Sequence, residues 1–446
     1  MILLSRIRVM TIKTKSFQNL NELKVHLQSH EPTFYTSSKT STVIPYDKLS
    51  EEIKSSLTLG DLSKIPPQMM MKGDNLVLSG AVNWQDADQF LKANHRAIMT
   101  SPTEQLALVL AGVATSCTGE RCFAFGNLRK QIVRLKYLNH EGVEVELHRS
   151  QPFPQTAGLA AYQAAFAPYA HFKNAPFPRF ETATDLMIGT EGQLGIVTEL
   201  ELETTPHDNV TYVFLLLPRW EDDYRAHLEV FEKVQKYRGA VISCELLDAN
   251  CMSFLKPEER MGVNQDIILM EIKADQFEDV FDNLLNQLVH TSMEDVFEVS
   301  GHKFHQIRAS VPRAVFEENS RMGVKKMGTD CQVKGEDFSK LLDTYRTAAK
   351  IGVRYNLFGH FGDAHLHFNF MPSPSDTALC QKEFEQLYQR VYEWKGSPFA
   401  EHGIGLLKQK FIKSFITDVQ RGVFKELKKV HDPHGQFFPQ GFMLSV

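Results

Sequence analysis

Alternating apolar and polar positions in the first half of the chain predict short strands joined by turns and helices. Residues 74–92 have the pattern of a β-branched strand, a turn and then a helix that begins near Asp86. Farther along, residues 132–139 and 143–147 alternate on either side of the turn Glu141-Gly142, which predicts two strands. This pattern indicates an α+β or α/β fold.

The stretch from about 207 to 300 predicts a separate βαβ-type domain. A strand at 213–217 precedes a helix over 222–237, and a second strand at 266–272 precedes another helix. That helix carries an apolar stripe formed by Phe277, Val280, Phe281, Leu284, Leu285 and Leu288. Such spacing is typical of any helix packed on a core, so we interpret the stripe as core rather than as a cofactor site.

The composition is that of a globular protein with more than one core. The 446 residues are 43% hydrophobic, which suggests two or three domains. The net charge of −5 provides no basic field, so we expect no nucleic-acid partner. The longest apolar runs, such as 213–217 and 267–270, are far shorter than the roughly 20 residues that cross a bilayer.

The cysteines and the N-terminus bear on the compartment. The six cysteines form no CxxC pair, and a chain of this size needs no disulfides, so a reducing compartment fits best. The first 15 residues are basic without an acidic residue, as in a weak targeting tail, but their apolar part is too short for a secretory signal. Met10 is an alternative start.

Side chains that can do chemistry gather between residues 359 and 408. Four of the 17 histidines lie there, namely His360, His365, His367 and His402. The run His367-Phe368-Asn369 has strand character, so His367 and Asn369 should face one pocket while Phe368 points into a core. We place His365 outside this alternation and expect it to point elsewhere.

Three of these polar residues can form a metal site. His360 precedes a Gly-Asp turn that can bring it back beside His367, and Glu401 can supply an oxygen ligand. Two nitrogens and one oxygen suit zinc or manganese and leave one position open for a substrate. Spacing alone also allows surface or hydrogen-bonded core histidines, so both interpretations stay open.

His402 is a candidate general base. It follows Glu401 directly, and Gly403 and Gly405 let the backbone come near a bound molecule. An uncharged imidazole can accept a proton at neutral pH, and a neighbouring cation favours the uncharged form. A metal ion and a base side by side would therefore make chemical sense.

The motifs around these residues resemble those of the FAD-linked D-2-hydroxy-acid dehydrogenases. GHFGDAHLHFN at 359–369 is similar to the family motif GHxGDGNLHxN, and AEHGIGLLK at 400–408 is similar to AEHGIG. DLMIGTEGQLGIVTELELE at 185–203 resembles the DLxxGSEGTLGIxTE segment of the family's FAD domain. SPTEQLALVLAGVATSCTG at 101–119 resembles its flavin-contacting loop. The family includes D-lactate, glycolate and D-2-hydroxyglutarate dehydrogenases.

Two further matches occur in the family's order. Residues 306–308 are similar to the substrate-arginine segment, and KKMGTDCQV at 325–333 resembles KxGTDxxVP. An arginine can bind a carboxylate through two parallel hydrogen bonds, although a surface salt bridge would be the default without the other motifs. The resemblance, which covers roughly residues 17–446, implies that Arg308, Lys326 and Asn369 contact an acidic substrate.

By this resemblance the fold is α+β, of the vanillyl-alcohol-oxidase type. It implies a two-subdomain FAD-binding domain over 1–206 and an α+β cap (substrate) domain over 207–385. Residues 386–446 would form a C-terminal segment that returns to the FAD domain.

The resemblance also assigns the flavin to three loops. Two of them, at 102–119 and 189–196, would bind the phosphates and the ring edge of the flavin through backbone and side-chain groups. The residues concerned are Pro102, Thr103, Gly112, Thr115, Ser116, Thr118, Gly119, Gly189, Glu191, Gly192, Gly195 and Ile196. The family's glycine-rich pyrophosphate loop, PRGGGTS, corresponds to residues 33–42, which contain no glycine. There the phosphate would meet the charge of Lys39 and the hydroxyls of Ser37, Ser38, Thr40 and Ser41.

The reaction implied by the resemblance is oxidation of a D-2-hydroxy acid to a 2-oxo acid. The substrate carboxylate would bind Arg308, and the metal would acidify the hydroxyl. His402 would remove the hydroxyl proton as the Cα hydride moves to flavin N5. A quinone, a cytochrome or an electron-transfer flavoprotein would then accept the electrons.

Three alternatives stay open. The alkyl-dihydroxyacetone-phosphate synthase branch uses flavin without net redox, but its usual histidine cluster differs from EHGIG. A flavin-poor, non-catalytic subunit or binding protein would result if the loop at 33–42 cannot hold FAD. A metal-only hydrolase fits the histidines but leaves the flavin-domain matches unexplained. We expect a cytoplasmic protein, peripheral on the inner membrane if quinone-linked, or a mitochondrial matrix protein in a eukaryote; a homodimer stays open.

Overall fold

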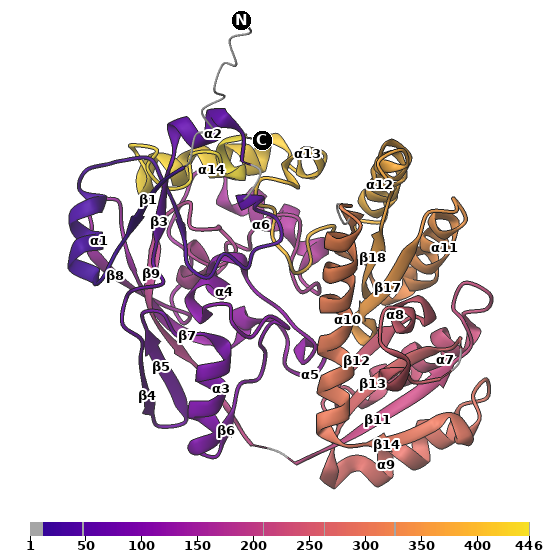
Figure 1. Ribbon diagram of the computed structural model, residues 1–446. Coiled ribbons are helices and arrows are strands. Elements are labelled where there is room, and N and C mark those ends of the chain that lie inside the picture. The colour runs from indigo at the N-terminus through magenta and orange to yellow at the C-terminus, as the bar shows by residue number, and fades with distance from the viewer. Residues whose placement is uncertain (1–11, 47–48, 208, 263, 325–326, 446) are drawn as a thin grey trace, which may run out of the picture.

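The computed structural model describes residues 12–445 except 47–48, 208, 263 and 325–326. Most of the basic N-terminal stretch, Met10 and the expected substrate residue Lys326 lie outside the described residues. Figure 1 shows two bodies side by side, and the C-terminal segment crosses from the second body back to the first.

The first body contains two sheets. A parallel three-stranded sheet has the order β1 (Lys13–Ser16), β3 (Thr58–Asp61), β2 (Thr33–Thr36), with α1 (Leu20–Leu27) and α2 (Glu51–Ser56) in its connections. An antiparallel five-stranded sheet has the order β4 (Gln68–Lys72), β5 (Asn75–Ser79), β9 (Ile196–Leu202), β7 (Ile132–Leu138), β8 (Glu144–His148). The strands predicted around residues 75, 132 and 144 are thereby confirmed.

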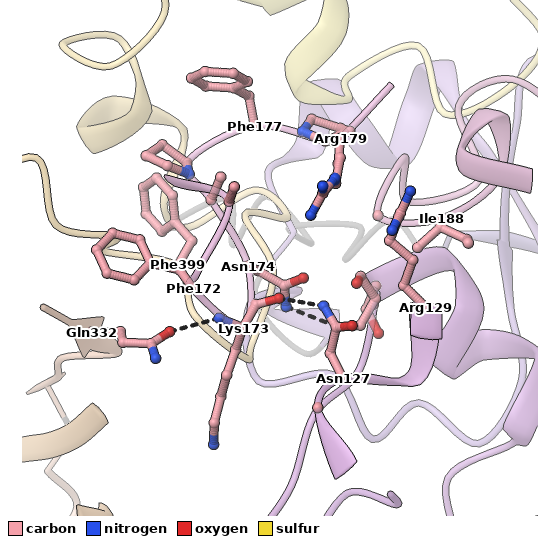
Figure 2. A pocket seen from close by; sticks show the side chains of 18 of the residues that line it. Asn127, Arg129, Phe172, Lys173, Asn174, Phe177, Arg179, Ile188, Gln332 and Phe399 are labelled. Atoms are coloured by element: carbon pink, nitrogen blue, oxygen red, sulfur yellow. Dashed lines mark hydrogen bonds between the residues drawn. The ribbon is translucent and has the colours of Figure 1, made fainter. Parts of the chain in front are cut away.

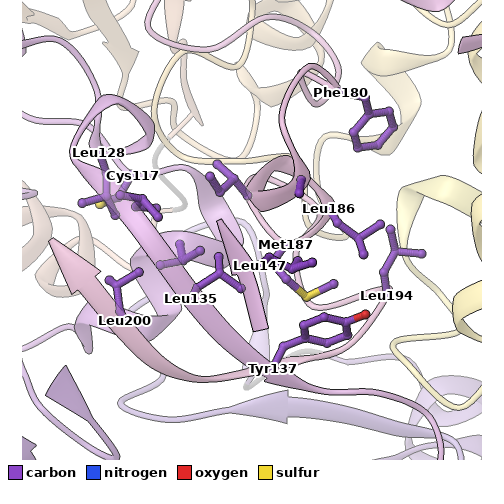
Figure 3. Close-up of a cluster of buried hydrophobic side chains, with 14 of the residues drawn as sticks. Cys117, Leu128, Leu135, Tyr137, Leu147, Phe180, Leu186, Met187, Leu194 and Leu200 are labelled. Carbon is purple, nitrogen blue, oxygen red and sulfur yellow. The ribbon is translucent and has the colours of Figure 1, made fainter. Parts of the chain in front are cut away.

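Helices cover the five-stranded sheet and close the first core. They are α3 (Trp84–Ala93), α4 (Val109–Thr115), α6 (Leu159–Phe166) and, from the end of the chain, α14 (Asp418–His431) and α15 (Phe442–Ser445). Figure 3 shows part of this core, in which Leu135 and Leu200 of the sheet belong to one cluster with Leu186 and Met187. Helix α3 begins at Trp84, close to the start expected near Asp86, and the Asn83 side chain caps it by accepting the Asp86 amide N–H at 2.7 Å.

The second body is one eight-stranded antiparallel sheet. Its order is β14 (Val296–Val299), β11 (Val210–Leu217), β13 (Asp266–Lys273), β12 (Val241–Leu247), β17 (Tyr355–His360), β18 (His365–Phe370), β15 (Met327–Gly328), with β16 (Cys331–Gln332) also paired to β18. Strands β11 and β12 run parallel with β13 between them, which is a split βαβ unit. The pattern analysis did not identify β12.

In the described part of this body, the helices that flank the sheet are α7 (Arg225–Val234), α8 (Ala249–Ser253), α9 (Phe277–Asn283), α10 (Gly301–Arg321), α11 (Phe338–Ala349) and α12 (Thr377–Glu393). Val280, Leu284 and Leu285 of the predicted stripe are fully buried, so its interpretation as core is confirmed. The expected domain boundary between 385 and 386 falls inside α12, whose apolar side chains belong to the second core.

The chain crosses back to the first body over residues 397–408. Ser397 pairs with Gln332 of β16, and farther on the Leu406 amide donates to the Val43 carbonyl at 3.1 Å. A short helix α13 (Gln409–Ile412) follows, and then α14 packs on α6 in the first core. The crossing segment therefore ties both bodies together at residues 400–405.

All six cysteines are buried and free. None of the described helices has the length and apolar character needed to span a bilayer.

Candidate active site

The hairpin of β17 and β18 places the candidate ligands His360 and His367 side by side. His360 ends β17 opposite His365, and His367 faces Phe358 across the hairpin. The turn between the strands closes with Ala364 in the left-handed conformation at φ 51°. The rings of His360 and His367 lie 6.0 Å apart between centroids. The spacing of these two residues around a Gly-Asp turn therefore predicted their proximity correctly.

The expectation that His365 points elsewhere is wrong. His365 and His367 are two positions apart on the same strand, so both side chains lie on one face of β18. The His365 ring lies 5.1 Å from that of His360 and 4.8 Å from that of His367. Its Nε2 is 2.9 Å from Asp330 Oδ1, and its Nδ1 is buried without a hydrogen-bond partner in the described part of the chain.

Glu401 reaches this hairpin from the crossing segment. Its Oε2 lies 2.9 Å from His360 Nε2 and 3.4 Å from His367 Nε2. Four residues can each offer one ligand atom to a shared ion, and these atoms lie within 4.8 Å of one another. The four residues are His360, His365, His367 and Glu401. The predicted three-residue set therefore converges, with His365 as a possible fourth member.

Hydrogen bonds behind the rings determine which ring nitrogens face Glu401. His367 Nδ1 lies 3.2 Å from the Thr329 carbonyl, which can only accept, so Nδ1 carries the hydrogen and Nε2 presents a lone pair. On the other ring, His360 Nδ1 lies 2.8 Å from Glu245 Oε1. A lone pair and a carboxylate oxygen repel each other unless a proton or a metal ion lies between them. This donor set therefore fits a divalent cation.

The pair of His360 and Glu245 predicts how pH acts on the metal-free protein. Burial would lower the pKa of His360, but Glu245 and Glu401 raise it to about 9 from 6.5. Burial would raise the pKa of Glu245, but His360 and Arg308 lower it to about 2 from 4.5. The stabilisation from His360 is thus complete below pH 6.5 and lost as the pH rises through 9.

At acidic pH the dependence of stability on pH runs in the opposite direction. The stabilisation from Glu245 is present above pH 4.5 and lost as the pH falls towards 2. We expect the unfolding temperature of chelated protein to fall between pH 6.5 and 9, and zinc to reduce this fall because the ion replaces the proton on His360. Thermal unfolding with EDTA or with zinc measures the difference; equal alkaline losses would contradict the prediction.

Asp330 is a buried carboxylate with several hydrogen-bond partners in the site, and the sequence pattern did not identify it. It accepts hydrogen bonds from Lys408 Nζ at 2.9 Å and from the His402 backbone amide at 2.8 Å, besides its contact with His365. Although burial alone would raise its pKa, Lys408 and His402 hold the pKa of this carboxyl well below its usual range. Asp330, His367 and His402 also form a second group whose ligand atoms could share an ion.

His402, the candidate base, stacks on His367 with 5.0 Å between ring centroids. Its Nδ1 lies 3.6 Å from Asp330 Oδ2. Burial lowers the pKa of His402 to about 4, with Lys408 adding to the effect and Asp330 opposing it. The imidazole is therefore uncharged at neutral pH, which is the state that a proton acceptor needs.

Arg308, the candidate substrate residue, lies on α10 with its side chain 5% exposed. Its Nη2 is 2.8 Å from Glu245 Oε2, and its Nε is 3.4 Å from Glu120 Oε2. Nη2 also donates to Thr103 Oγ1 at 3.5 Å, while Nη1 is buried with no hydrogen-bond partner among the described residues. A guanidinium nitrogen therefore remains available for a carboxylate.

Asn369 shares the face of His365 and His367 but lies deeper in the hairpin. Its Nδ2 donates to Asn356 Oδ1 at 2.9 Å across the strands, and its Oδ1 is buried without a partner in the described structure. A bound molecule with a hydrogen-bond donor would satisfy this oxygen.

A cavity of about 220 Å³ lies between the two bodies and the crossing segment. Figure 2 shows Arg129 and Arg179 beside it, with Gln332 on the cap side. Four of the expected flavin residues line the cavity, namely Thr115, Ser116, Gly189 and Glu191. Ligand pockets usually measure about 300–1,000 Å³, so this space would hold only part of a dinucleotide.

Lys173 connects the cavity to the histidine cluster. Its Nζ is 3.2 Å from Asp363 Oδ2 in the hairpin turn and 3.4 Å from the Gly119 carbonyl. The next residue, Asn174, donates to the carbonyls of Ser116 and Ala400 at 2.8 and 3.0 Å. These contacts join the expected flavin loop at 115–119 to the segment that carries Glu401.

The remaining flavin residues divide into two groups. Gly112 packs on Trp84, Gly119 on the Ser101 carbonyl, Gly195 on Tyr137, and Ile196 in a small core with Phe17, so these four contact protein. In contrast, Gly192 has no atom within 4 Å of where a Cβ would lie, and Thr118 Oγ1 is buried without a partner among the described residues. Pro102 is partly buried beside Thr103.

The glycine-free loop after β2 keeps one feature of a glycine-rich turn, because Lys39 has φ 56°. The hydroxyls of Ser37, Ser38, Thr40 and Ser41 make no side-chain hydrogen bond with the described residues and are partly or fully exposed. Together with Thr118 and Gly192, these donors fit an FAD phosphate and ring edge, although side chains at 37–41 limit close approach of the backbone.

Comparison with known proteins adds three findings. Residues 207–440 match the profile of the C-terminal domain of FAD-linked oxidases. A mitochondrial D-lactate dehydrogenase (cytochrome) of Kluyveromyces lactis is 19% identical over 375 residues, or 80% of this chain and 60% of that protein. The mitochondrial D-2-hydroxyglutarate dehydrogenase of Danio rerio is 25% identical over 271 residues, or 57% of this chain and 49% of that protein.

A bacterial relative is the D-2-hydroxyglutarate dehydrogenase of Xanthomonas citri pv. viticola, 24% identical over 342 residues, or 72% of this chain and 65% of that protein. This chain thus spans less than two thirds of the length of each relative. Among solved structures, alkyldihydroxyacetonephosphate synthase has a TM-score of 0.69 at 12% identity and covers 95% of this chain and 76% of its own. The fold expected from the sequence is confirmed by this likeness.

Proposed function

Since this chain belongs to the FAD-linked oxidases, and within them to the FAD-linked D-2-hydroxy-acid dehydrogenases, we propose that it oxidises a D-2-hydroxy acid to the 2-oxo acid. The observation that carries the proposal is the carboxylate of Glu401 between two ring nitrogens, with Arg308 reached through Glu245. This arrangement combines a candidate cation site with an arginine that can bind a substrate carboxylate.

FAD would be held by the loops at 37–41, 115–119 and 189–192, and a zinc or manganese ion by His360, His367 and Glu401. When bound, FAD would supply the acceptor for the Cα hydride, and the ion would draw electrons from the substrate's hydroxyl and carboxylate oxygens. All other steps belong to side chains of this protein.

Arg308 would bind the substrate carboxylate through the nitrogen that has no partner, Nη1. His402 would take the hydroxyl proton, so that the substrate loses one hydride and one proton and becomes the 2-oxo acid. Asp330, 3.6 Å from His402 Nδ1, would then stabilise the imidazolium. Thr103 and Glu120 would exclude other orientations of the guanidinium.

Charge balance supports the need for a cation. Four carboxylates belong to the cluster, those of Glu120, Glu245, Asp330 and Glu401, against two basic side chains, Arg308 and Lys408. Without an ion, the pKa of His360 is raised to about 9, so a proton on this ring offsets part of the negative charge, and Lys173 lies nearby on Asp363. A divalent ion would replace that proton and add positive charge, which favours the carboxylate of an acidic substrate.

The visible absorption spectrum tests the proposal. We expect purified protein supplied with FAD to show flavin bands that bleach anaerobically with D-lactate, glycolate or D-2-hydroxyglutarate, and to bleach far more slowly after chelation. Flavin bands that no acid bleaches would contradict it. Lack of FAD binding would instead favour the non-catalytic subunit, which the glycine-free loop at 33–42 supports.

The electron acceptor, whether quinone, cytochrome or flavoprotein, would be identified by which one re-oxidises the bleached enzyme.

A further inference from the structure

Glu245 lies in the middle of β12 and contacts both halves of the proposed site. Its side chain is fully buried. One oxygen, Oε1, lies 2.8 Å from His360 Nδ1; the other, Oε2, lies 2.8 Å from Arg308 Nη2 and 3.1 Å from Arg308 Nε. A single carboxylate therefore lies between the proposed metal ligand and the proposed substrate arginine.

We propose that Glu245 is a positioning residue that couples ion binding to recognition of the substrate carboxylate. This inference rests on the proposed function and assigns to Glu245 two simultaneous tasks. Through Oε1 it keeps the hydrogen of His360 on Nδ1, which leaves the Nε2 lone pair for the ion. Through Oε2 it holds two nitrogens of Arg308 and leaves Nη1 as the donor for the substrate.

Each task has a physical basis. A carboxylate that accepts from the second ring nitrogen of a metal-bound histidine fixes its tautomer and raises its basicity. A guanidinium whose Nε and Nη2 both donate to one buried carboxylate oxygen cannot turn freely, so the remaining nitrogen has a defined direction. Because the two oxygens belong to one rigid group, a displacement of His360 also displaces Arg308, and ion and substrate should bind cooperatively.

Glu245→Gln separates these tasks because the amide keeps the shape but offers only one acceptor oxygen. Its NH2 group must face either His360 or Arg308, so one of the two contacts becomes donor against donor. Glu271→Gln is a matched control. Glu271 is also buried, on the neighbouring strand β13, and pairs with Arg121 at 2.9 Å. Among the described residues it makes no hydrogen bond or ion pair with His360, His367 or Arg308.

The experiment titrates the chelated 446-residue chain with zinc chloride and measures KM and kcat for D-lactate and D-2-hydroxyglutarate. We expect E245Q to weaken zinc binding by about 10- to 100-fold, the usual cost of losing such a partner, and to raise KM more than it lowers kcat. In wild type, a saturating hydroxy acid should tighten zinc binding, and in E245Q this tightening should be lost. E271Q should match the wild type in zinc affinity even if it unfolds at a lower temperature.

The outcomes separate the two claims. If the wild type binds no zinc, both the proposed ion site and this inference are overturned. If the wild type binds zinc and E245Q binds it equally well with an unchanged KM, only the role of Glu245 is overturned. Should E245Q fail to fold, Glu245→Asp keeps the charge but is one methylene shorter and cannot reach both partners. We expect E245D to lose at least ten-fold in zinc affinity or in KM, and wild-type values in both would overturn the inference.

Discussion

Replacement of His402 by alanine is expected to lower the rate of hydroxy-acid oxidation by about 10²- to 10⁴-fold, the usual contribution of a general base. The reason lies in its environment. The pKa of His402 is lowered to about 4, mainly by burial, so the ring is uncharged at neutral pH. Asp330 Oδ2 lies 3.6 Å from His402 Nδ1 and can stabilise the charged form once the ring has accepted a proton. Anaerobic stopped-flow absorbance of flavin bleaching measures this step directly.

Two controls make the result specific. His148→Ala removes a half-exposed histidine on β8 whose Nε2 lies 2.8 Å from Glu146 Oε1, and its bleaching rate should equal that of the wild type. The metal content of H402A should also be unchanged if His360, His367 and Glu401 hold the ion. Loss of the ion in H402A would favour the alternative group of Asp330, His367 and His402, and a wild-type bleaching rate would remove His402 from the role of base.

The local part of this site could be predicted from the sequence. His360 and His367 are joined by a tight turn, so their proximity follows from a hairpin that needs no knowledge of the rest of the chain. The error at His365 was one of counting, since positions two apart share a face of a strand. Glu401 lies far along the chain, and we expected it in the site because a carboxylate would complete a set of two nitrogens and one oxygen for a metal ion.

The residues that surround the ligands could not be predicted in the same way. Glu245 reaches His360 because β12 pairs with β17, a contact between residues 115 positions apart. Strand order of this kind depends on how the whole sheet assembles. A signal was nevertheless present, because a glutamate inside the apolar run at 241–247 is seldom buried without a partner. Asp330 offered a weaker signal, since its partners come from β18 and from the crossing segment.

The fold shows the same division between local and long-range information. Strands whose apolar and polar positions alternate, such as β7 and β8, were identified from the pattern alone. Strand β12 was missed because its run of buried residues has no alternation, which cannot be distinguished from a helical core segment by periodicity. The return of α14 to the first core depends on contacts between the two ends of the chain, and only the resemblance predicted it.

Removal of Arg308 is expected to have the second large effect, on both binding and folding. Loss of a buried charged partner of a carboxylate costs about 2–5 kcal/mol, so Arg308→Ala should lower kcat/KM by roughly 30- to 4,000-fold. The same change leaves Glu120 without its cation and removes one of the two cationic partners of Glu245, the other being His360, and breaking a buried ion pair costs about 3–5 kcal/mol of stability. Denaturant unfolding and steady-state kinetics measure the two effects separately.

Arg308→Lys distinguishes recognition from charge. A lysine keeps the positive charge near Glu245, so most of the stability should remain, but it cannot bind two carboxylates in one plane and kcat/KM should still fall at least ten-fold. Arg121→Ala is the matched control, because it removes the cationic partner of the buried Glu271, and we expect a loss of stability and no change in KM. A wild-type kcat/KM in R308K would show that the guanidinium is needed for folding alone, and the acid would then have to be held by the ion and by Asn369.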